Sequence, residues 1–217
     1  HLSRFCEDLI IWSSSEFAFV ELDDAFCTGS SMMPQKKNTD SLELVRGKTG
    51  RVIGHLTGWL TTMKGLPSGY NKDLQEDKEA VFDAETTVRS STRATTLVVR
   101  SLTLDPARTE SAASGLALAT DVADLLVARG VPFREAHEVV GRMVRDLLAT
   151  NRDFASLSPA DWRRYHERLD VDAAGRITAR GSVTARRTPQ STAPDAVASA
   201  LHEVRRWVDE RTVATDH

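Results

Sequence analysis

The sequence contains little that would suit an extracellular, membrane-bound or nucleic-acid-binding protein. Its 217 residues include only two cysteines, Cys6 and Cys27, which are too few for a disulfide framework and lack metal-ligand spacing. No apolar run approaches the roughly 18 residues that a membrane-spanning helix needs, and no signal peptide opens the chain. With 28 basic against 31 acidic residues, no overall positive field exists to attract nucleic acid or anionic lipid. We therefore expect a cytoplasmic protein with no metal centre and neither nucleic-acid nor membrane partner.

Strand-like alternation of apolar and polar residues is also lacking, and helical periodicity takes its place. One apolar stripe covers residues 41–63, and a second covers about 76–104, with a polar middle that predicts partial burial. Asp40 followed by Glu43 resembles a capping box that would begin the first of these helices, and Gly65 would end it. The sequence therefore predicts an all-α fold.

The predicted helices become shorter after about residue 110. Amphipathic segments at 118–128 and 133–150 are followed by Ser158-Pro159, a pair that is typical of a helix start. Residues 170–194 are rich in Gly, Thr, Arg and Pro and indicate an irregular segment, before a last helix over 194–211. These changes predict two parts along the chain.

We expect a central helical-bundle portion at residues 1–112 and a smaller helical domain at residues 113–217. The first residues already follow a helical pattern, because Leu2, Phe5 and Leu9 recur at steps of three or four. We therefore expect the chain to begin inside a helix of a longer protein.

Residues 28–40, here called the serine loop, carry a dense set of reactive side chains. Gly29 permits backbone conformations that other residues resist, so the loop can move. The loop offers hydroxyl, cationic and amide groups from Ser30, Ser31, Lys36, Lys37 and Asn38. Such a loop can fold over an anion and present a serine oxygen to it, although the same residues also suit a polar linker before a helix.

Residues 66–79, here called the tyrosine segment, form a second polar stretch. Tyr70, Lys72, Gln75 and Lys78 are spaced so that several can point to one side as the next helix begins. A helix N-terminus there would add partial positive charge suited to a carboxylate. A solvated charge run at a helix start is the other interpretation of these residue types.

The two segments each contain an ordered motif. The first reads Gly29-Ser30-Ser31-x-Met33-Pro34-Gln35-Lys36-Lys37-Asn38, and the second reads Leu66-Pro67-x-x-Tyr70-Asn71-Lys72-Asp73-Leu74-Gln75-Glu76-Asp77-Lys78. Together they resemble the argininosuccinate lyase family of the fumarase/aspartase superfamily, and the second motif is the more specific of the two. The similarity covers about residues 1–85 and returns at 119–123 and 129–137.

The resemblance implies that argininosuccinate is split into arginine and fumarate by anti elimination, with no metal or other cofactor. The family serine at the position of Ser30 acts in proton transfer; we favour Ser30 as the base, and the role of proton donor stays open. Lys36 would favour the alkoxide of this serine, and Lys36 and Asn38 would hold the carboxylates of the fumarate half. The substrate-binding residues implied are Asn38, Tyr70, Gln75 and Lys78, with Lys72 as a further candidate that supports the loop.

The resemblance also implies a homotetramer in which three subunits contribute residues to each site. The family's N-terminal portion, about half of the enzyme, contributes a histidine and further binding residues and has no counterpart in this chain. We therefore expect the 217 residues alone to lack measurable lyase activity. Thr39 replaces a residue that is usually Pro in the family, which frees its φ angle and can loosen the loop.

Three alternative functions fit parts of the sequence. A related adenylosuccinate lyase shares the Ser-Ser-x-Met-Pro-x-Lys core, but the spelling Gln35-Lys36-Lys37 and the tyrosine segment argue against it. A non-catalytic, crystallin-like helical protein would share the fold, although the side chains needed for chemistry are present. Nucleic-acid binding has only scattered basic residues in its favour, without interleaved aromatic side chains.

Overall fold

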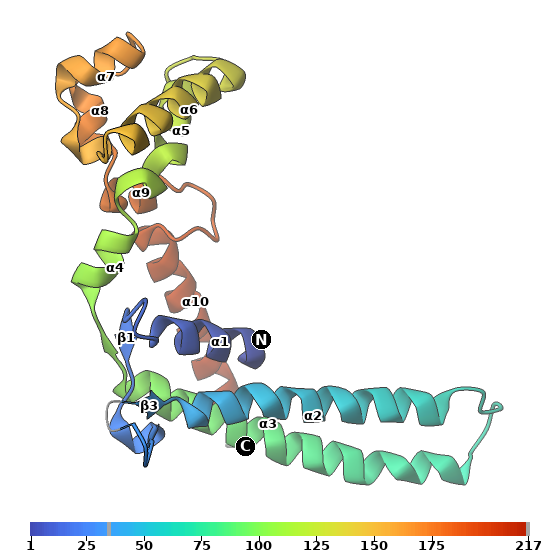
Figure 1. Cartoon of the computed structure of the whole chain (residues 1–217). Coiled ribbons are helices and arrows are strands. Elements are labelled where there is room, and N and C mark those ends of the chain that lie inside the picture. Colours follow the sequence, from blue (N-terminus) through green and yellow to red (C-terminus); the bar gives the residue numbers. More distant parts are fainter. Residues whose placement is uncertain (34–35, 216–217) are drawn as a thin grey trace. The chain divides into compact units, whose positions relative to one another are not determined.

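The computed structural model describes residues 1–33 and 36–215 and confirms the all-α fold, with strands of only two residues in that part of the chain (Figure 1). The chain divides into two compact units, residues 1–108 and the residues from Thr109 on. Both motifs lie in the first unit, except that Pro34 and Gln35 of the serine loop fall outside the described residues.

Two long antiparallel helices dominate the first unit (Figure 1). Helix α2 (Asp40–Met63) and helix α3 (Asp77–Ser101) pack along each other, and residues 64–76 join them at one end. Helix α2 ends where the sequence predicts, because Gly65 has a φ of +73°, which glycine adopts without steric cost. Helix α1 (Leu2–Trp12) packs mainly against α2.

Two short antiparallel strand pairs lie in the same unit. Strand β1 (Val20–Glu21) pairs with β4 (Thr103–Leu104), and β2 (Thr28–Gly29) pairs with β3 (Lys37–Asn38). A 3-10 helix, Asp24–Phe26, lies between β1 and β2. The predicted helix over 76–104 is therefore too long: α3 ends at Ser101, and the chain becomes extended because it pairs with β1.

A small core holds α1, the start of α2 and the end of α3 together. Its buried residues are Cys6, Leu9, Val20, Leu22, Leu42, Val45 and Val98. The polar middle of α3 is partly buried as predicted, with Thr87, Ser91 and Thr95 each at most 6% exposed. Further along α2, however, Ile53, Leu56 and Leu60 are between 58% and 63% exposed, so the apolar stripe is largely uncovered.

Ionic contacts join α2 and α3 in this uncovered stretch. Asp83 on α3 accepts hydrogen bonds from Arg51 Nε and from His55 Nε2, each at 2.6 Å. The hydrogen bond from Arg51, reinforced by that from His55, lowers the pKa of the Asp83 carboxyl group. The pairing therefore favours an ionised Asp83 between the two helices.

The predicted capping box at the start of α2 is wrong. Asp40 is the first residue of the helix, and Thr39 occupies the N-cap position without a side-chain capping bond. The Asp40 carboxylate instead accepts a hydrogen bond from the Thr28 hydroxyl group. This contact ties the beginning of the serine loop to the helix that follows it.

The second unit consists of shorter helices around its own core. They are α5 (Ala119–Ala128), α6 (Phe133–Ala149), α7 (Pro159–Tyr165), α8 (Val171–Arg176), α9 (Ala179–Thr184) and α10 (Pro194–Thr215), with 3-10 helices at Gly115–Leu118 and Phe154–Ser156. The boundary between the two units falls within helix α4 (Pro106–Ala112). The core includes Val122, Leu126, Met143, Leu147, Phe154 and Trp162. Trp162 stacks on Phe154 at a centroid distance of 5.8 Å.

Local sequence signals explain most boundaries in this unit. Ser158 caps α7 as predicted and forms a complete capping box with Asp161. Residues 170–194 are not wholly irregular, because the side chains of Asp170 and Thr178 cap the short helices α8 and α9. Phe133, the first residue of α6, is 63% exposed and lies outside the buried face of that helix.

No single helix among the described residues is long and apolar enough to span a membrane. Residues 106–112 together with 115–128 pass this test of length and composition as a pair, with a 64° bend between them. Val122, Ala123 and Leu126 of that pair are buried in the core of the second unit, as in the core helix of many globular proteins.

Candidate active site

The serine loop is held as a hairpin directly before α2. Strands β2 and β3 place Thr28 opposite Asn38 and Gly29 opposite Lys37, so the loop leaves and re-enters a paired stem. The Ser41 hydroxyl donates to the Phe26 carbonyl at 2.8 Å, which adds to the contact between Thr28 and Asp40. The stem therefore fixes the two ends of the loop, next to Ser30 and next to Lys36.

Ser30 occupies a polar turn at the start of the loop. Its Oγ accepts hydrogen bonds from the backbone amides of Met32 and Met33, both at 3.2 Å. Donors directed at a hydroxyl oxygen can stabilise negative charge that develops on that oxygen. Lys36, at the other end of the loop, is exposed to solvent. Its backbone amide donates to the Met33 carbonyl at 3.0 Å.

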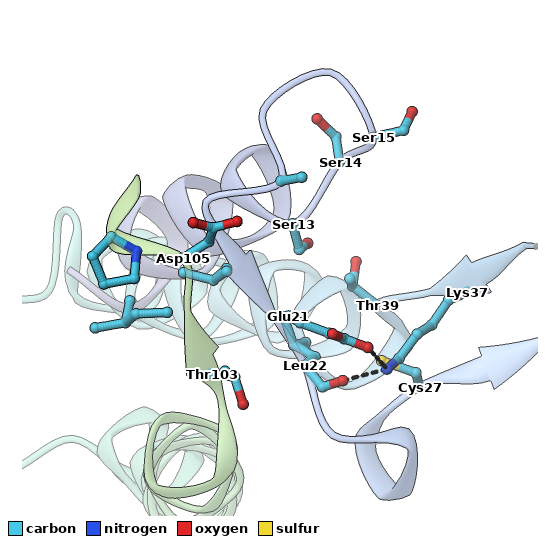
Figure 2. Close-up of a pocket in the computed structure, with 14 residues that line it drawn as sticks. Ser13, Ser14, Ser15, Glu21, Leu22, Cys27, Lys37, Thr39, Thr103 and Asp105 are labelled. Carbon is cyan, nitrogen blue, oxygen red and sulfur yellow. Dashed lines mark hydrogen bonds and ion pairs between the residues drawn. The ribbon is translucent and has the colours of Figure 1, made fainter. Parts of the chain in front are cut away.

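A cavity of about 490 Å³ lies beside the loop stem (Figure 2). Its lining comes from the α1–β1 connection, β1, the loop stem and β4, and includes Ser13, Cys27, Lys37 and Asp105. Ser30, Lys36 and Asn38 are not among its lining residues. Burial raises the pKa of the Cys27 thiol, which favours its neutral form. The cavity therefore does not coincide with the residues predicted to act on substrate.

The tyrosine segment lies at the other end of α2. Its Lys72–Glu76 stretch forms a 3-10 helix that leads into α3, and Gln75 Nε2 donates to the Tyr70 hydroxyl group at 3.1 Å. Tyr70 is 75% exposed, and Lys72 is also exposed. The structure thus brings Tyr70 and Gln75 together at a surface open to a ligand.

The N-terminus of α3 is less suited to an anion than predicted. The first turn of the helix contains Asp77 and Glu79, whose negative charges oppose the partial positive charge of the helix end. Lys78 Nζ pairs with Asp77 Oδ1 at 3.0 Å. Carboxylate binding here would therefore depend on lysine side chains rather than on the helix end.

The two segments are separated by the full length of α2 (Figure 1). This helix has 24 residues, and at about 1.5 Å per residue it is about 36 Å long. Ser30, Lys36 and Asn38 lie before its first turn, whereas Tyr70, Lys72, Gln75 and Lys78 follow its last. A single copy of the chain therefore does not bring the two sets of predicted site residues together.

Among the described residues, no group of three or more His, Cys, Asp or Glu side chains gathers in a way that could hold a metal ion.

The sequence analysis overlooked the contacts of Lys37, which lies in the loop motif but was given no separate role. The acidic residues Glu21 and Asp24, shortly before the loop, were the available signal for them.

Two family models match separate parts of the chain. Residues 1–54 match the model described as Lyase, and residues 116–184 match the model described as Argininosuccinate lyase C-terminal. Among solved structures, EDDS lyase in complex with formate is 30% identical, with a TM-score of 0.74 over 98% of this chain and 46% of that one. An EDDS lyase variant with bound fumarate is 28% identical, with a TM-score of 0.73 over the same shares. Fold and sequence together define a helical protein of the lyase superfamily.

Curated relatives narrow this class. The argininosuccinate lyase of Geobacter sp. (strain M21) is 52% identical over 202 residues, which are 93% of this chain and 44% of the relative. That of Pseudomonas aeruginosa (strain PAO1) is 49% identical over 214 residues, which are 97% of this chain and 46% of the relative. The chain matches the C-terminal portion of the argininosuccinate lyase family, as its motifs predict. It spans less than half the length of these curated relatives.

Proposed function

We propose that the chain supplies the serine loop and the tyrosine segment of an argininosuccinate lyase, which eliminates fumarate from argininosuccinate and leaves arginine. The observation that carries this proposal is the Ser30 hydroxyl group, held by two backbone amides in a chain 52% identical to such a lyase. The fumarate bound to a structural relative supports a dicarboxylate product. We expect the enzyme to act in the cytoplasm without a cofactor.

The proposed reaction begins with removal of a proton from the carbon next to a substrate carboxylate. The Ser30 alkoxide takes this proton, and the electrons of the C–H bond enter that carboxylate to give a doubly charged aci-carboxylate. The electrons then return to form the carbon–carbon double bond, while the carbon–nitrogen bond breaks. The leaving nitrogen keeps the electron pair of that bond and takes a proton from solvent or from a second acid group of the assembled site. Lys36 and Asn38 stabilise the negative charge that develops on the carboxylates.

The proposed site is built from more than one copy of the chain. The length of α2, about 36 Å, separates Ser30 from Tyr70, so both can reach one substrate only when they come from different copies. Helices α2 and α3 expose apolar side chains that favour self-association, including Ile53, Leu56, Leu60, Val81 and Phe82. We therefore propose a homotetramer, as the family resemblance implies.

A chimaera tests this proposal. The residues that precede the matched region in the Geobacter relative are joined ahead of His1, and fumarate release from argininosuccinate is followed by its ultraviolet absorbance. Ser30→Ala should lower kcat by about 10²- to 10⁴-fold, the usual contribution of a positioned proton-transfer group. Ser15→Ala, which removes an exposed serine outside the loop, should leave turnover unchanged. Unchanged turnover in Ser30→Ala would refute the assigned role.

Substrate and assembly have separate tests with the same chimaera. Adenylosuccinate serves as the competing substrate. If fumarate is released faster from adenylosuccinate than from argininosuccinate, the protein is an adenylosuccinate lyase and the proposal is wrong. Mixing unfolded Ser30→Ala and Tyr70→Ala proteins before refolding should yield more activity than either alone, because some sites then combine an intact serine loop with an intact tyrosine segment. Activity that does not rise on mixing would contradict a shared site.

A further inference from the structure

Lys37, the residue that follows Lys36, lies in the stem of the serine loop. In the stem of the loop, Lys37 on β3 lies opposite Gly29 on β2. Ser30 directly follows β2 and Lys36 directly precedes β3. A displacement of this stem would therefore move both of the side chains to which the proposed function gives a catalytic role.

Oxygen acceptors on the preceding segment contact the Lys37 ammonium group. It donates to the Leu22 carbonyl and lies 3.5 Å from Glu21 Oε1 (Figure 2). It also lies 2.7 Å from Asp24 Oδ1. These contacts match the three donors that an ammonium group carries. Because Leu22 is only 3% exposed in the core of the first unit, they fasten the stem of the loop to that core.

The same contacts give Lys37 different surroundings from Lys36. The hydrogen bond with Asp24 raises the pKa of the Lys37 ammonium group, so the group stays charged at neutral pH. Two carboxylates balance this charge at the stem, whereas Lys36 is exposed in the open part of the loop. Both lysines are exposed, so the difference between them is that two carboxylates pair with the Lys37 ammonium group, while Lys36 lies in the open part of the loop.

We propose that Lys37 is a positioning residue of the lyase reaction. Its ammonium group fastens the loop stem to residues 21–24 and thereby sets where Ser30 and Lys36 lie, without touching substrate. This inference rests on the proposed function. Its physical basis is that a displacement of about 1 Å from the reactive geometry can cost about 100-fold in rate.

Activity in the chimaera gives the first measurement. Lys37→Met removes the ammonium group but keeps an unbranched side chain, and we expect kcat to fall about 10- to 100-fold with a much smaller change in KM. Lys37→Arg keeps the charge and should recover most of the loss. Lys48→Met, which removes an exposed lysine from α2, is the matched control and should retain the parent kcat.

Hydrogen exchange of the loop amides gives the second measurement and needs no activity. In Lys37→Met, amides of residues 28–33 and 36–38 should exchange faster than in the parent, while those of α2 stay unchanged. If Lys37→Met fails to fold, the pair Glu21→Gln and Asp24→Asn tests the same contacts from the other side. A parent kcat with either set of substitutions, or lost activity without faster exchange of the loop, overturns the proposal.

The two measurements also separate this inference from the function on which it rests. A chimaera that releases no fumarate refutes the proposed function, and the positioning role falls with it. Faster exchange of the loop amides in Lys37→Met would then show only that Lys37 anchors the stem. An active chimaera whose Lys37→Met variant keeps both its kcat and its loop exchange refutes the positioning role alone.

Discussion

The two units of this chain use similar apolar patterns in opposite ways. In the second unit, the stripe of α6 is covered by the same chain, and Met143 and Leu147 are at most 2% exposed. In the first unit, the stripe of α2 is covered only near its start, while Leu56 is 58% exposed. An amphipathic helix therefore predicts an apolar face that needs a partner, but it does not say whether the partner belongs to the same chain.

The largest expected effect on stability lies in the closed core of the second unit. Trp162 is fully buried against Phe154, so Trp162→Ala should lower the free energy of unfolding by about 3–5 kcal/mol. Denaturant unfolding followed by circular dichroism measures this loss. Phe133→Ala, which truncates a 63% exposed ring in the same unit, should cost less than about 0.5 kcal/mol. Equal losses for the two variants would remove the contrast between core and surface.

A matched pair of leucines sharpens the comparison within α2. Leu42 is fully buried, so Leu42→Ala should destabilise the isolated chain by about 2–5 kcal/mol. Leu56→Ala should leave the unfolding of dilute, dissociated protein within about 0.5 kcal/mol of the parent, because water already reaches this side chain. Sedimentation at increasing concentration should show weaker self-association for Leu56→Ala. Unchanged association would show that this part of the stripe is not a contact between copies.

The contacts of Asp83 between α2 and α3 predict that the stability of this helix pair depends on pH. A lowered carboxyl pKa in the folded state stabilises the protein above the unfolded pKa of about 3.9, and this stabilisation disappears as the pH falls through the folded value. Asp83→Asn should therefore be less stable than the parent near neutral pH, and the difference should shrink as the pH falls below about 4. Denaturation midpoints measured from neutral to acidic pH test this, and a difference independent of pH would contradict it.

The smallest expected effect concerns the start of α2. Thr39 has a φ of −88° and follows the extended strand β3, a backbone that accepts proline with little adjustment. Thr39→Pro should therefore stabilise the first unit by about 0.4–1 kcal/mol, because it restricts the unfolded chain. Thermal unfolding measures the gain. A lower melting temperature would indicate that Thr39 makes a contact in the folded protein that proline cannot replace.

Local signals predicted the helices better than their ends. The stripe of α6 and the cap at Ser158 were visible because both depend on residues close together in sequence. The end of α3 was misplaced because Thr103 and Leu104 pair with β1, more than 80 residues earlier. The capping role of Asp40 was misassigned because its carboxylate bonds to Thr28 across the loop. Contacts between distant segments thus decided what local propensity left open.

The candidate site shows the same division. The motifs predicted site residues in the serine loop and the tyrosine segment, since side chains suited to proton transfer and carboxylate binding occur together in these short stretches. The motifs did not predict the distance between the serine loop and the tyrosine segment, because that distance follows from α2 being one unbroken helix. Likewise, the contacts of Lys37 with residues 21–24 depend on tertiary structure and are not apparent from the motif.

Amino-acid order by itself determined that this protein is helical, where its chemical groups lie along the chain and which lyase family it matches, because periodicity and motifs are local properties. The tertiary structure alone decided that one copy keeps its two groups of predicted site residues about 36 Å apart and leaves most of the apolar stripe of α2 exposed. Distance and burial depend on how remote segments pack.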